Sequence, residues 1–186
     1  MIDGFSIEGY AIVSRNGMLA GADGLMPNSL KFAEDQQFLD EEMDRAALLV
    51  HGRKSHEGQD NSPKRKRLLL TRAAGAFTTT PVEPNTWLWN PQATPFSDVC
   101  KALGVTSGMV AILGGTAAYD LFLPLYSRFH LARADGVDLP GGVPVFAAVR
   151  EGHPPEAVMA AAGLRQVEDV TLNAGSRLRR LTFARG

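Results

Sequence analysis

The sequence predicts an α/β fold, with a mostly parallel central sheet, flanking helices and an antiparallel hairpin at its C-terminal end. Three observations lead to this class. The chain has 186 residues, of which 45% are hydrophobic and 21% charged, the balance of one globular domain over residues 1–186. Short apolar runs alternate with segments of helical periodicity. The last two strand-like segments follow each other closely, as in a hairpin.

The first half of the chain is expected to contain one long helix and several strands. Ser6–Ser14 reads as a strand, and the glycine-rich Gly17–Asn28 as a mobile loop. Lys31–Ala46 is predicted to be helical, because apolar residues such as Phe38 and Met43 recur at helical spacing. Shorter apolar runs are predicted as buried strands: Ala47–His51, Leu68–Thr71 and Trp87–Trp89.

The second half continues the alternation of helices and strands. Pro95–Leu103 is a predicted helix, and Met109–Leu113 a buried strand that stops at Gly114. Thr116–Leu123 is a predicted helix ended by Pro124. A strand, a short helix followed by the C-cap Gly163, and the closing antiparallel pair come next: Arg128–Ala134, Pro155–Ala162, Val167–Leu172 and Arg177–Ala184.

Composition narrows the class of protein. The net charge of −1 argues against a general nucleic-acid binder, which needs a basic surface. No signal peptide is evident, and no run approaches the roughly 18 apolar residues that would cross a membrane. The lone Cys100 is expected to be a buried small hydrophobe, and it is compatible with a reducing compartment. We therefore expect a cytoplasmic protein with a small-molecule partner and without nucleic-acid or membrane partners.

The strongest local motif is Gly114-Gly115-Thr116-Ala117, which follows an apolar strand and opens a helix. Adjacent glycines let the backbone approach a ligand closely, and a helix start offers N–H groups without intrahelical acceptors. Together these features suit an anion such as phosphate. A tight turn without any ligand is the alternative for this segment alone.

Two further strand ends carry groups that suit phosphate. The segment from His51 to Glu57 includes Arg53, Lys54 and Ser55, and it begins where a buried strand ends. Ligands of α/β sheets bind beyond the carboxyl ends of the strands. Thr71-Arg72 follows the next strand, where the planar guanidinium could hold phosphate. Solvated loops remain the alternative at both ends.

The order and spacing of these segments resemble the dihydrofolate reductase superfamily over most of the chain. Val50–Glu57 looks like that family's hydrophobic–Gly–Arg–Lys–Thr signature, and Leu68–Arg72 like its next strand with a terminal Ser-Arg. Ile112–Phe122 is similar to its Gly-Gly strand-to-helix turn. Phe129–Ala132, followed by Gly141–Phe146, resembles its late strand and the segment ending in Phe-Pro. The resemblance implies the three-layer dihydrofolate reductase-like fold.

The resemblance also implies NADPH as the cofactor and gives roles to individual residues. Arg53 and Arg72 would hold the adenosine 2′-phosphate, with Thr71 beside Arg72 at the strand end. Ile12 and Ala20 would border the nicotinamide and its ribose. The pyrophosphate would meet residues of two segments: Lys54, Ser55, Gly114, Gly115, Thr116 and Ala117.

The substrate side departs from the folate enzymes. Their loop Trp is absent, and Asp35 is the best match for their catalytic carboxylate because Phe38-Leu39 follows it. Glu34 is the second choice, and Ser29 would match if no gap is allowed. Glu34 and Asp35 could equally line a solvated helix face. The family's Thr partner of the carboxylate falls at Ala132, which lacks a hydroxyl, so dihydrofolate itself is a doubtful substrate.

The implied activity is transfer of a hydride from NADPH to a dihydropterin or a related heterocycle, dihydrofolate-like or methanopterin-like. Riboflavin-pathway reductases, which act on a ribosylamino-pyrimidine and also lack the Trp, are one alternative, and a catalytically inactive nucleotide-binding module is another. No metal site is expected, because neither helical nor strand spacing brings His51 and His56 together. Lys64–Arg67 is expected to be a solvated basic loop. The assembly is expected to be a monomer or a homodimer.

Overall fold

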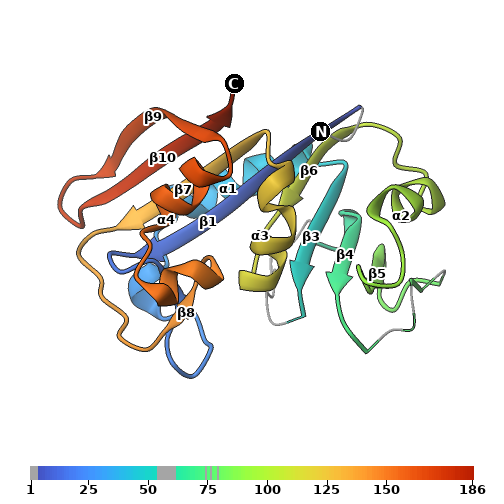
Figure 1. Cartoon of the computed structure of the whole chain (residues 1–186), viewed down its shortest axis with the longest axis horizontal. Coiled ribbons are helices and arrows are strands. Elements are labelled where there is room, and N and C mark those ends of the chain that lie inside the picture. The colour runs from blue at the N-terminus through green and yellow to red at the C-terminus, as the bar shows by residue number, and fades with distance from the viewer. Residues whose placement is uncertain (1–3, 54–61, 74, 76, 79) are drawn as a thin grey trace.

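The computed structural model describes residues 4–53, 62–73, 75, 77–78 and 80–186 (Figure 1). The helices are α1 (Ala33–Arg45), α2 (Phe96–Ala102), α3 (Thr116–Phe122) and α4 (Pro155–Ala161). Short 3-10 helices are η1 (Asn28–Leu30), η2 (Ser62–Lys64), η3 (Leu123–Leu125) and η4 (Ala147–Glu151). The strands are β1 (Phe5–Ser14), β2 (Met18–Ala20), β3 (Leu48–Gly52), β4 (Arg67–Leu70), β5 (Thr86–Trp89), β6 (Gly108–Ile112), β7 (Arg128–Ala134), β8 (Val143–Pro144), β9 (Leu164–Asn173) and β10 (Leu178–Arg185).

The central sheet has eight strands in the order β5-β4-β3-β6-β1-β7-β10-β9. Neighbouring strands from β5 to β7 are parallel, whereas β10 pairs antiparallel with both β7 and β9. Figure 1 shows β1 running through the middle of this sheet and the β9–β10 hairpin at one edge. The predicted fold class, mostly parallel with an antiparallel C-terminal hairpin, is confirmed.

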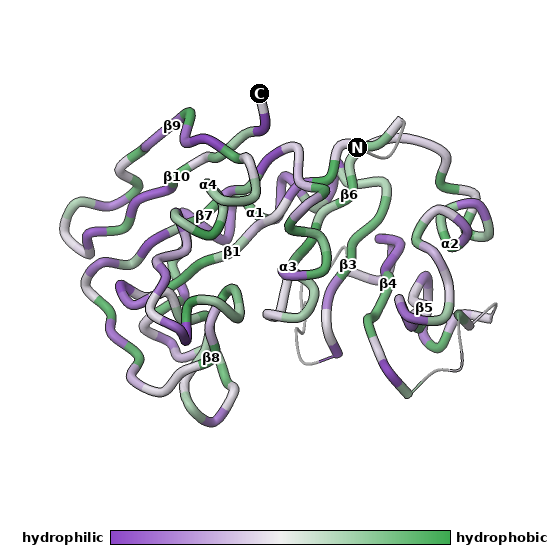
Figure 2. Tube along the Cα trace, in the orientation of Figure 1, coloured by the Kyte–Doolittle hydropathy of each residue, from purple (hydrophilic) through white to green (hydrophobic). Residues whose placement is uncertain are grey.

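The residues of β1 alternate between two faces of the sheet, as the pleat of a strand requires. Ile7 and Val13 pack into the larger core with α3 residues, whereas Tyr10 packs on the opposite face against α1. Figure 1 shows α3 and α4 in front of the sheet and α1 behind it, and Figure 2 shows the hydrophobic stretches gathered in the central strands. Alternation therefore gives the sheet an apolar face under α3 and a second face, under α1, that can carry function.

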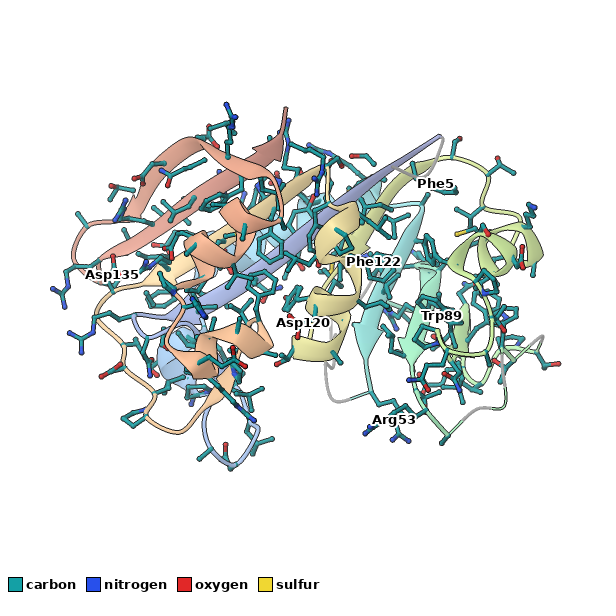
Figure 3. The ribbon with its side chains drawn as sticks, in the orientation of Figure 1. Phe5, Arg53, Trp89, Asp120, Phe122 and Asp135 are labelled. Carbon is teal, nitrogen blue, oxygen red and sulfur yellow. The ribbon has the colours of Figure 1, made fainter. Side chains whose placement is uncertain are left out.

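Beyond β3, on the side of the edge strand β5, aromatic rings fill the larger core. Phe96 of α2 packs against Trp89 at 5.5 Å and against Phe122 of α3 at 5.3 Å between ring centroids. Trp89 and Phe122 are labelled in Figure 3. Cys100 is buried here, as expected, and only 2% exposed. Within the described residues, no helix is long and apolar enough to cross a membrane.

The structure corrects several local predictions. Gly17–Asn28 is not all loop, because β2 pairs antiparallel with β8 and η1 begins at Asn28. Pro124 does not end the local helical structure but lies within η3, directly after α3. Strand β9 begins at Leu164, three residues earlier than the sequence predicted, and its exposed side chains hide the alternation that marks a strand.

The basic segment Lys64–Arg67 is not a solvated loop, so that expectation was wrong. Arg65 is 7% and Arg67 8% exposed. Arg65 forms an ion pair with Asp44 of α1 at 2.5 Å, and the Arg67 guanidinium donates to the backbone and hydroxyl oxygens of Ser62. These two guanidinium groups therefore fasten the start of β4 rather than supply free positive charge.

Candidate functional site

One cavity of about 1200 Å³ lies on the α1 face of the sheet and follows the carboxyl ends of the parallel strands. Side chains of β1, β7 and β10 form one end, and the segments that leave β3, β4, β5 and β6 form the other. Helix α1 and the segment from Leu19 to Met26 line the remaining walls. The carboxyl ends of parallel strands are where ligands of α/β sheets bind. We call the end formed by the segments that leave β3, β4, β5 and β6 the strand-exit end. We call the end formed by β1, β7 and β10, together with α1, the α1 end.

The strand-exit end brings together the three motifs found in the sequence. Arg53 follows β3, Thr71 and Arg72 follow β4, and Gly114–Ala117 leads from β6 into α3; all line the cavity. Figure 3 shows Arg53 at the end of β3. Because β4, β3 and β6 are adjacent parallel strands, their ends meet along one edge of the sheet. The residues Asn90–Gln92, which follow β5, also line this end.

The Gly114-Gly115 turn is tightly packed at Gly114 and open at Gly115. The Gly52 N–H donates to the Gly114 carbonyl at 2.6 Å, which joins the ends of β3 and β6. A Cβ on Gly114, where φ is +105°, would lie 3.0 Å from the Tyr119 ring. A Cβ on Gly115 would meet no atom within 4 Å, so the open side of the turn faces free space. The peptide between these two glycines is cis.

The polar groups of this end differ in their availability. Arg53 and Arg72 are exposed, and neither forms an ion pair or a side-chain hydrogen bond with a described residue. The Thr116 hydroxyl, in contrast, donates to the backbone carbonyl of Pro144, and the Thr71 hydroxyl accepts from the Ala73 N–H. The two guanidinium groups are therefore the side chains with free charge, whereas Thr116 faces the cavity with its hydroxyl engaged.

At the α1 end, two rows of side chains cross the sheet. Tyr10 of β1 lies opposite His130 of β7, and their rings stack at 4.9 Å. Ile12 of β1 lies opposite Ala132 of β7, which in turn lies opposite Arg180 of β10. All five line the cavity. This part of the wall therefore combines apolar, aromatic and cationic groups.

Helix α1 adds the candidate carboxyl group. Asp35 lines the cavity, and Phe38, one turn later on the same helical face, lies 6.1 Å from the Tyr10 ring. Burial raises the pKa of Asp35 to about 6, although the attraction of Arg180 acts in the opposite direction. Glu34 is exposed and outside the cavity wall, where its carboxylate accepts a hydrogen bond from Asn173. Asp35 is therefore the acidic group that can meet a ligand with a proton near neutral pH.

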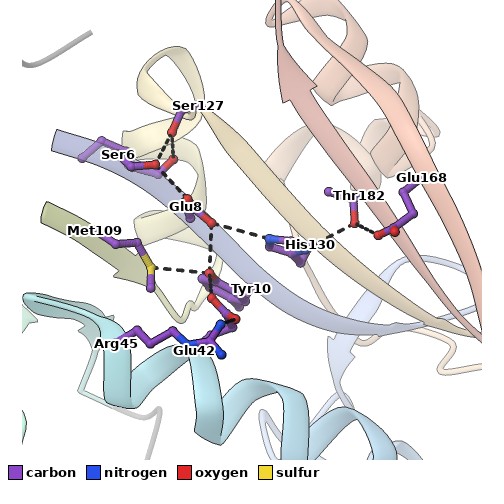
Figure 4. Close-up of polar contacts among 11 residues, drawn as sticks. Ser6, Glu8, Tyr10, Glu42, Arg45, Met109, Ser127, His130, Glu168 and Thr182 are labelled. Atoms are coloured by element: carbon purple, nitrogen blue, oxygen red, sulfur yellow. Dashed lines mark hydrogen bonds and ion pairs between the residues drawn. The ribbon is translucent and has the colours of Figure 1, made fainter.

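A polar network extends from the cavity wall under α1 (Figure 4). Glu8 lies 3.5 Å from the His130 Nε2, a contact that is an ion pair when the imidazole is protonated, and it accepts hydrogen bonds from Ser6 and Tyr10. Burial alone would raise the pKa of Glu8, but these hydrogen bonds and the attraction of His130 outweigh it and lower the pKa to about 2. On its other side the His130 ring lies 3.4 Å from the Thr182 hydroxyl. The network fixes the Tyr10–His130 pair in place.

The sequence matches no protein-family model and no curated protein. Solved structures do match over nearly the whole chain. A "putative riboflavin biosynthesis protein" from Shewanella sp. PV-4 aligns with a TM-score of 0.65 at 17% identity, covering 97% of this chain and 99% of that one. The dihydrofolate reductase of Enterococcus faecalis, complexed with NADP(H) and RAB-propyl, aligns with a TM-score of 0.63 at 13% identity, covering 97% and 96%. The chain has the dihydrofolate reductase-like fold. The resemblance seen in the sequence is confirmed at this level.

Within this dihydrofolate reductase-like fold, most of the predicted site residues line one cavity. The predicted residues that do so are Ile12, Ala20, Asp35, Arg53, Thr71, Arg72, Gly114, Gly115, Thr116 and Ala117. Glu34 does not, because it lies on the outer side of α1. Lys54, Ser55 and the nearby His56 and Glu57 fall outside the described residues. In the described part of the chain, no three His, Cys, Asp or Glu side chains group as metal ligands would.

Sequence reasoning missed several cavity residues, including Tyr10, His130 and Arg180. Tyr10 and His130 lie inside segments that were correctly predicted as strands, but only their pairing across the sheet places them on the cavity wall. Arg180 lies in the C-terminal tail, where the sequence offers no functional motif. The alternation of Arg180 and Thr182 with the buried Leu181 was the available signal.

Proposed function

We propose that this protein is an NADPH-dependent oxidoreductase that transfers a hydride to a dihydropterin or a related heterocycle. The observation that carries the proposal is the construction of the cavity. Its strand-exit end has an open glycine turn and two guanidinium groups without partners among the described residues, and its α1 end has a partly buried carboxyl group whose pKa is about 6. A phosphate-bearing cofactor suits the first end, and a heterocycle that must gain a proton suits the second.

The residues of the strand-exit end fit NADPH. Open space around Gly115 allows the backbone to approach a pyrophosphate without a Cβ in the way. Arg53 and Arg72 present planar, permanently charged groups of the kind that hold a 2′-phosphate, as NADPH and not NADH requires. Pockets for one small ligand measure roughly 300–1,000 Å³, so a cavity of about 1200 Å³ has room for a cofactor and at least part of a substrate.

The protein's own part in the reaction is to orient the reactants and to supply a proton. When bound, NADPH supplies the hydride. Ile12 and Ala20, both buried and both lining the cavity, would border the ring that carries it. Asp35, protonated in part near neutral pH, would donate a proton to the substrate ring nitrogen as charge develops there. Leu25 and Met26 line the mouth of the cavity and would exclude water when a ligand is bound.

A second candidate activity is reduction of a ribosylamino-pyrimidine, as in the riboflavin pathway. Ala132 favours it over dihydrofolate, because the buried alanine offers no hydroxyl to a pterin or to Asp35. The Shewanella structure, at 17% identity, is compatible with the same activity. Both candidates need the same cofactor and the same direction of hydride transfer.

Cofactor affinity tests the proposal first. Arg72→Ala should weaken NADPH binding by roughly 10- to 100-fold, because hydrogen bonds to charged groups contribute about 1.5–3 kcal/mol, while NADH binding should change little. Arg150→Ala is the matched control, since Arg150 is exposed on η4 and outside the cavity wall. Equal losses for NADPH and NADH would contradict the 2′-phosphate role, and absence of NADPH binding would refute the proposed function.

Turnover tests the second part of the proposal, the transfer of a hydride to a heterocycle. NADPH oxidation would be followed by absorbance with a panel of dihydropterins and ribosylamino-pyrimidines. Oxidation that depends on one of these substrates and is lost in Asp35→Asn is the expected result. Tight NADPH binding without turnover of any member of the panel would instead favour a nucleotide-binding module.

A further inference from the structure

Arg180 is a cavity residue that the proposed reaction does not use. It lies in the middle of β10, opposite Ala132, and its side chain lines the α1 end of the cavity. Its Nε is buried without a hydrogen-bond partner. Among the described residues, the Arg180 side chain forms no hydrogen bond or ion pair. An arginine that is permanently charged and partly buried is unusual without an acceptor.

The neighbouring Arg179 shows what the same strand does with an arginine that faces away from the cavity. Arg179 forms ion pairs with Asp169 and, at 3.8 Å, with Asp135. Asp169 lies on β9 of the same hairpin, and Asp135 directly follows β7. Acidic side chains are therefore available on this hairpin, and a shortage of them does not explain why the Arg180 side chain has no partner. It has none because it faces the ligand cavity.

Packing holds the Arg180 guanidinium in place without satisfying its hydrogen bonds. Its central carbon lies 3.8 Å from the centroid of the Phe38 ring. Phe38 is itself fixed by His130, whose ring centroid is 5.2 Å away. A cation above an aromatic ring is stabilised through the face of the guanidinium, whereas its N–H groups lie in the plane and still need acceptors. The group is therefore fixed in position with its donors unused.

Asp35 interacts electrostatically with Arg180, but it does not fully balance the charge of the guanidinium. The two groups attract each other, but they form no ion pair within 4.0 Å. Burial disfavours the ionised form of Asp35, but with a pKa of about 6 the carboxyl group is mostly ionised at neutral pH, so it offsets the charge of Arg180 without direct contact. Both groups thus lie at the α1 end, one ready to give a proton and the other in need of an oxygen acceptor.

We propose that Arg180 binds a carboxylate or phosphate group that the substrate carries close to the ring protonated by Asp35. This inference rests on the proposed function for the identity of that ring. The planar fork of arginine matches the two oxygens of such groups. Ala132, opposite Arg180 on the neighbouring strand, has a methyl side chain that offers the guanidinium no acceptor. The substrate class is therefore an anionic heterocycle, and Arg180 determines its selection over neutral analogues.

The test compares pairs of ligands that differ by one carboxylate: pterin-6-carboxylate with pterin, and orotate with uracil. Dissociation constants are measured by calorimetry at neutral pH, with and without NADPH. In at least one pair the acid should bind at least about tenfold more tightly than its neutral partner, the lower end of what a charge-assisted hydrogen bond contributes. Arg180→Gln should bring the two constants within about twofold of each other. Competition by inorganic phosphate distinguishes a phosphate-preferring site from a carboxylate-preferring one.

Arg179→Gln is the matched control, and it should keep the preference for the acid. Arg180→Lys, which keeps the charge without the fork, should show an intermediate preference, and it covers the case in which Arg180→Gln does not fold. Equal binding of acid and neutral ligand by the wild type, absence of acid binding at millimolar concentration, or a preference that survives in Arg180→Gln would each overturn the inference. If NADPH binds normally while the preference is absent, this inference fails alone. If the preference is present without NADPH binding, the reductase proposal fails instead.

Discussion

Replacing Asp35 with Asn tests the environment of the candidate proton donor through its effect on stability. Burial raises the pKa of Asp35 from 3.8 to about 6. At about 1.36 kcal/mol for each pKa unit, ionisation of Asp35 costs the folded state up to about 3 kcal/mol at neutral pH. The cost is absent below about pH 3.8, where the carboxyl group is protonated in the folded and the unfolded chain. It develops between about pH 3.8 and about pH 6 and is fully present above that range.

Asparagine cannot ionise, so Asp35→Asn should be more stable than the wild type at about pH 8, by about 1–3 kcal/mol. The lower value allows for water in the cavity. The difference should shrink toward zero at about pH 4. Urea unfolding followed by circular dichroism across this range measures it. Glu34→Gln is the matched control: the pKa of the exposed Glu34 is lowered by its hydrogen bond from Asn173, so this variant should show no gain. A gain for Asp35→Asn that does not change with pH, or no gain at the alkaline end, would refute the reasoning.

Two further substitutions test other parts of the site. Glu8→Gln should lower stability at neutral pH by about 1–3 kcal/mol, because the pKa of Glu8 is about 2 in the folded state against 4.5. That loss should diminish as the pH falls from 4.5 toward 2, and a loss independent of pH would argue against the charge of Glu8 as its source. Gly115→Val should leave the melting temperature near that of the wild type but weaken NADPH binding by at least about tenfold, since its side chain enters open space. Gly114→Ala is the contrast, with about 1–3 kcal/mol lost because φ is +105°. Normal NADPH binding by Gly115→Val would contradict the cofactor position.

The strand-exit end was predictable from sequence because its information is local. Each motif follows its own strand directly, and the strands themselves are recognised by short apolar runs such as Leu48–Val50. Parallel pairing of adjacent strands then brings their carboxyl ends together, and no other sequence feature is needed to predict that they meet. The strands β2 and β8 were missed for the opposite reason, since they have three and two residues and are too short to show a period.

The α1 end was less predictable because its residues meet only through the register of the sheet. Arg180 reaches the cavity because β10 pairs with β7, 48 positions away in register at Ala132. Strand alternation places Arg180 and Arg179 on opposite faces, but nothing in the sequence says which face lines a cavity and which, like that of Arg179, meets a carboxylate such as Asp169. The buried Arg65 was misjudged similarly, because its partner Asp44 comes from α1. Charged residues near strand ends are usually exposed, and only long-range packing identifies the exceptions.

The different origins of the two ends suggest how a substrate can change while the cofactor is kept. The row Ile12, Ala132 and Arg180 crosses three strands on one face of the sheet, and each member touches the α1 end of the cavity. The strand-exit residues follow other strands, so substitutions in this row leave them in place. Ala132 and Arg180 are best interpreted together: where the folate pattern has a threonine hydroxyl beside the carboxyl group, this chain has a methyl group and, one strand further, a guanidinium with free donors. The hydrogen-bonding capacity at this end has therefore moved from β7 to β10 and become cationic. A heterocycle with an anionic group close to its ring should therefore fit beside Asp35 better than dihydrofolate, whose carboxylates lie on the distant glutamate tail.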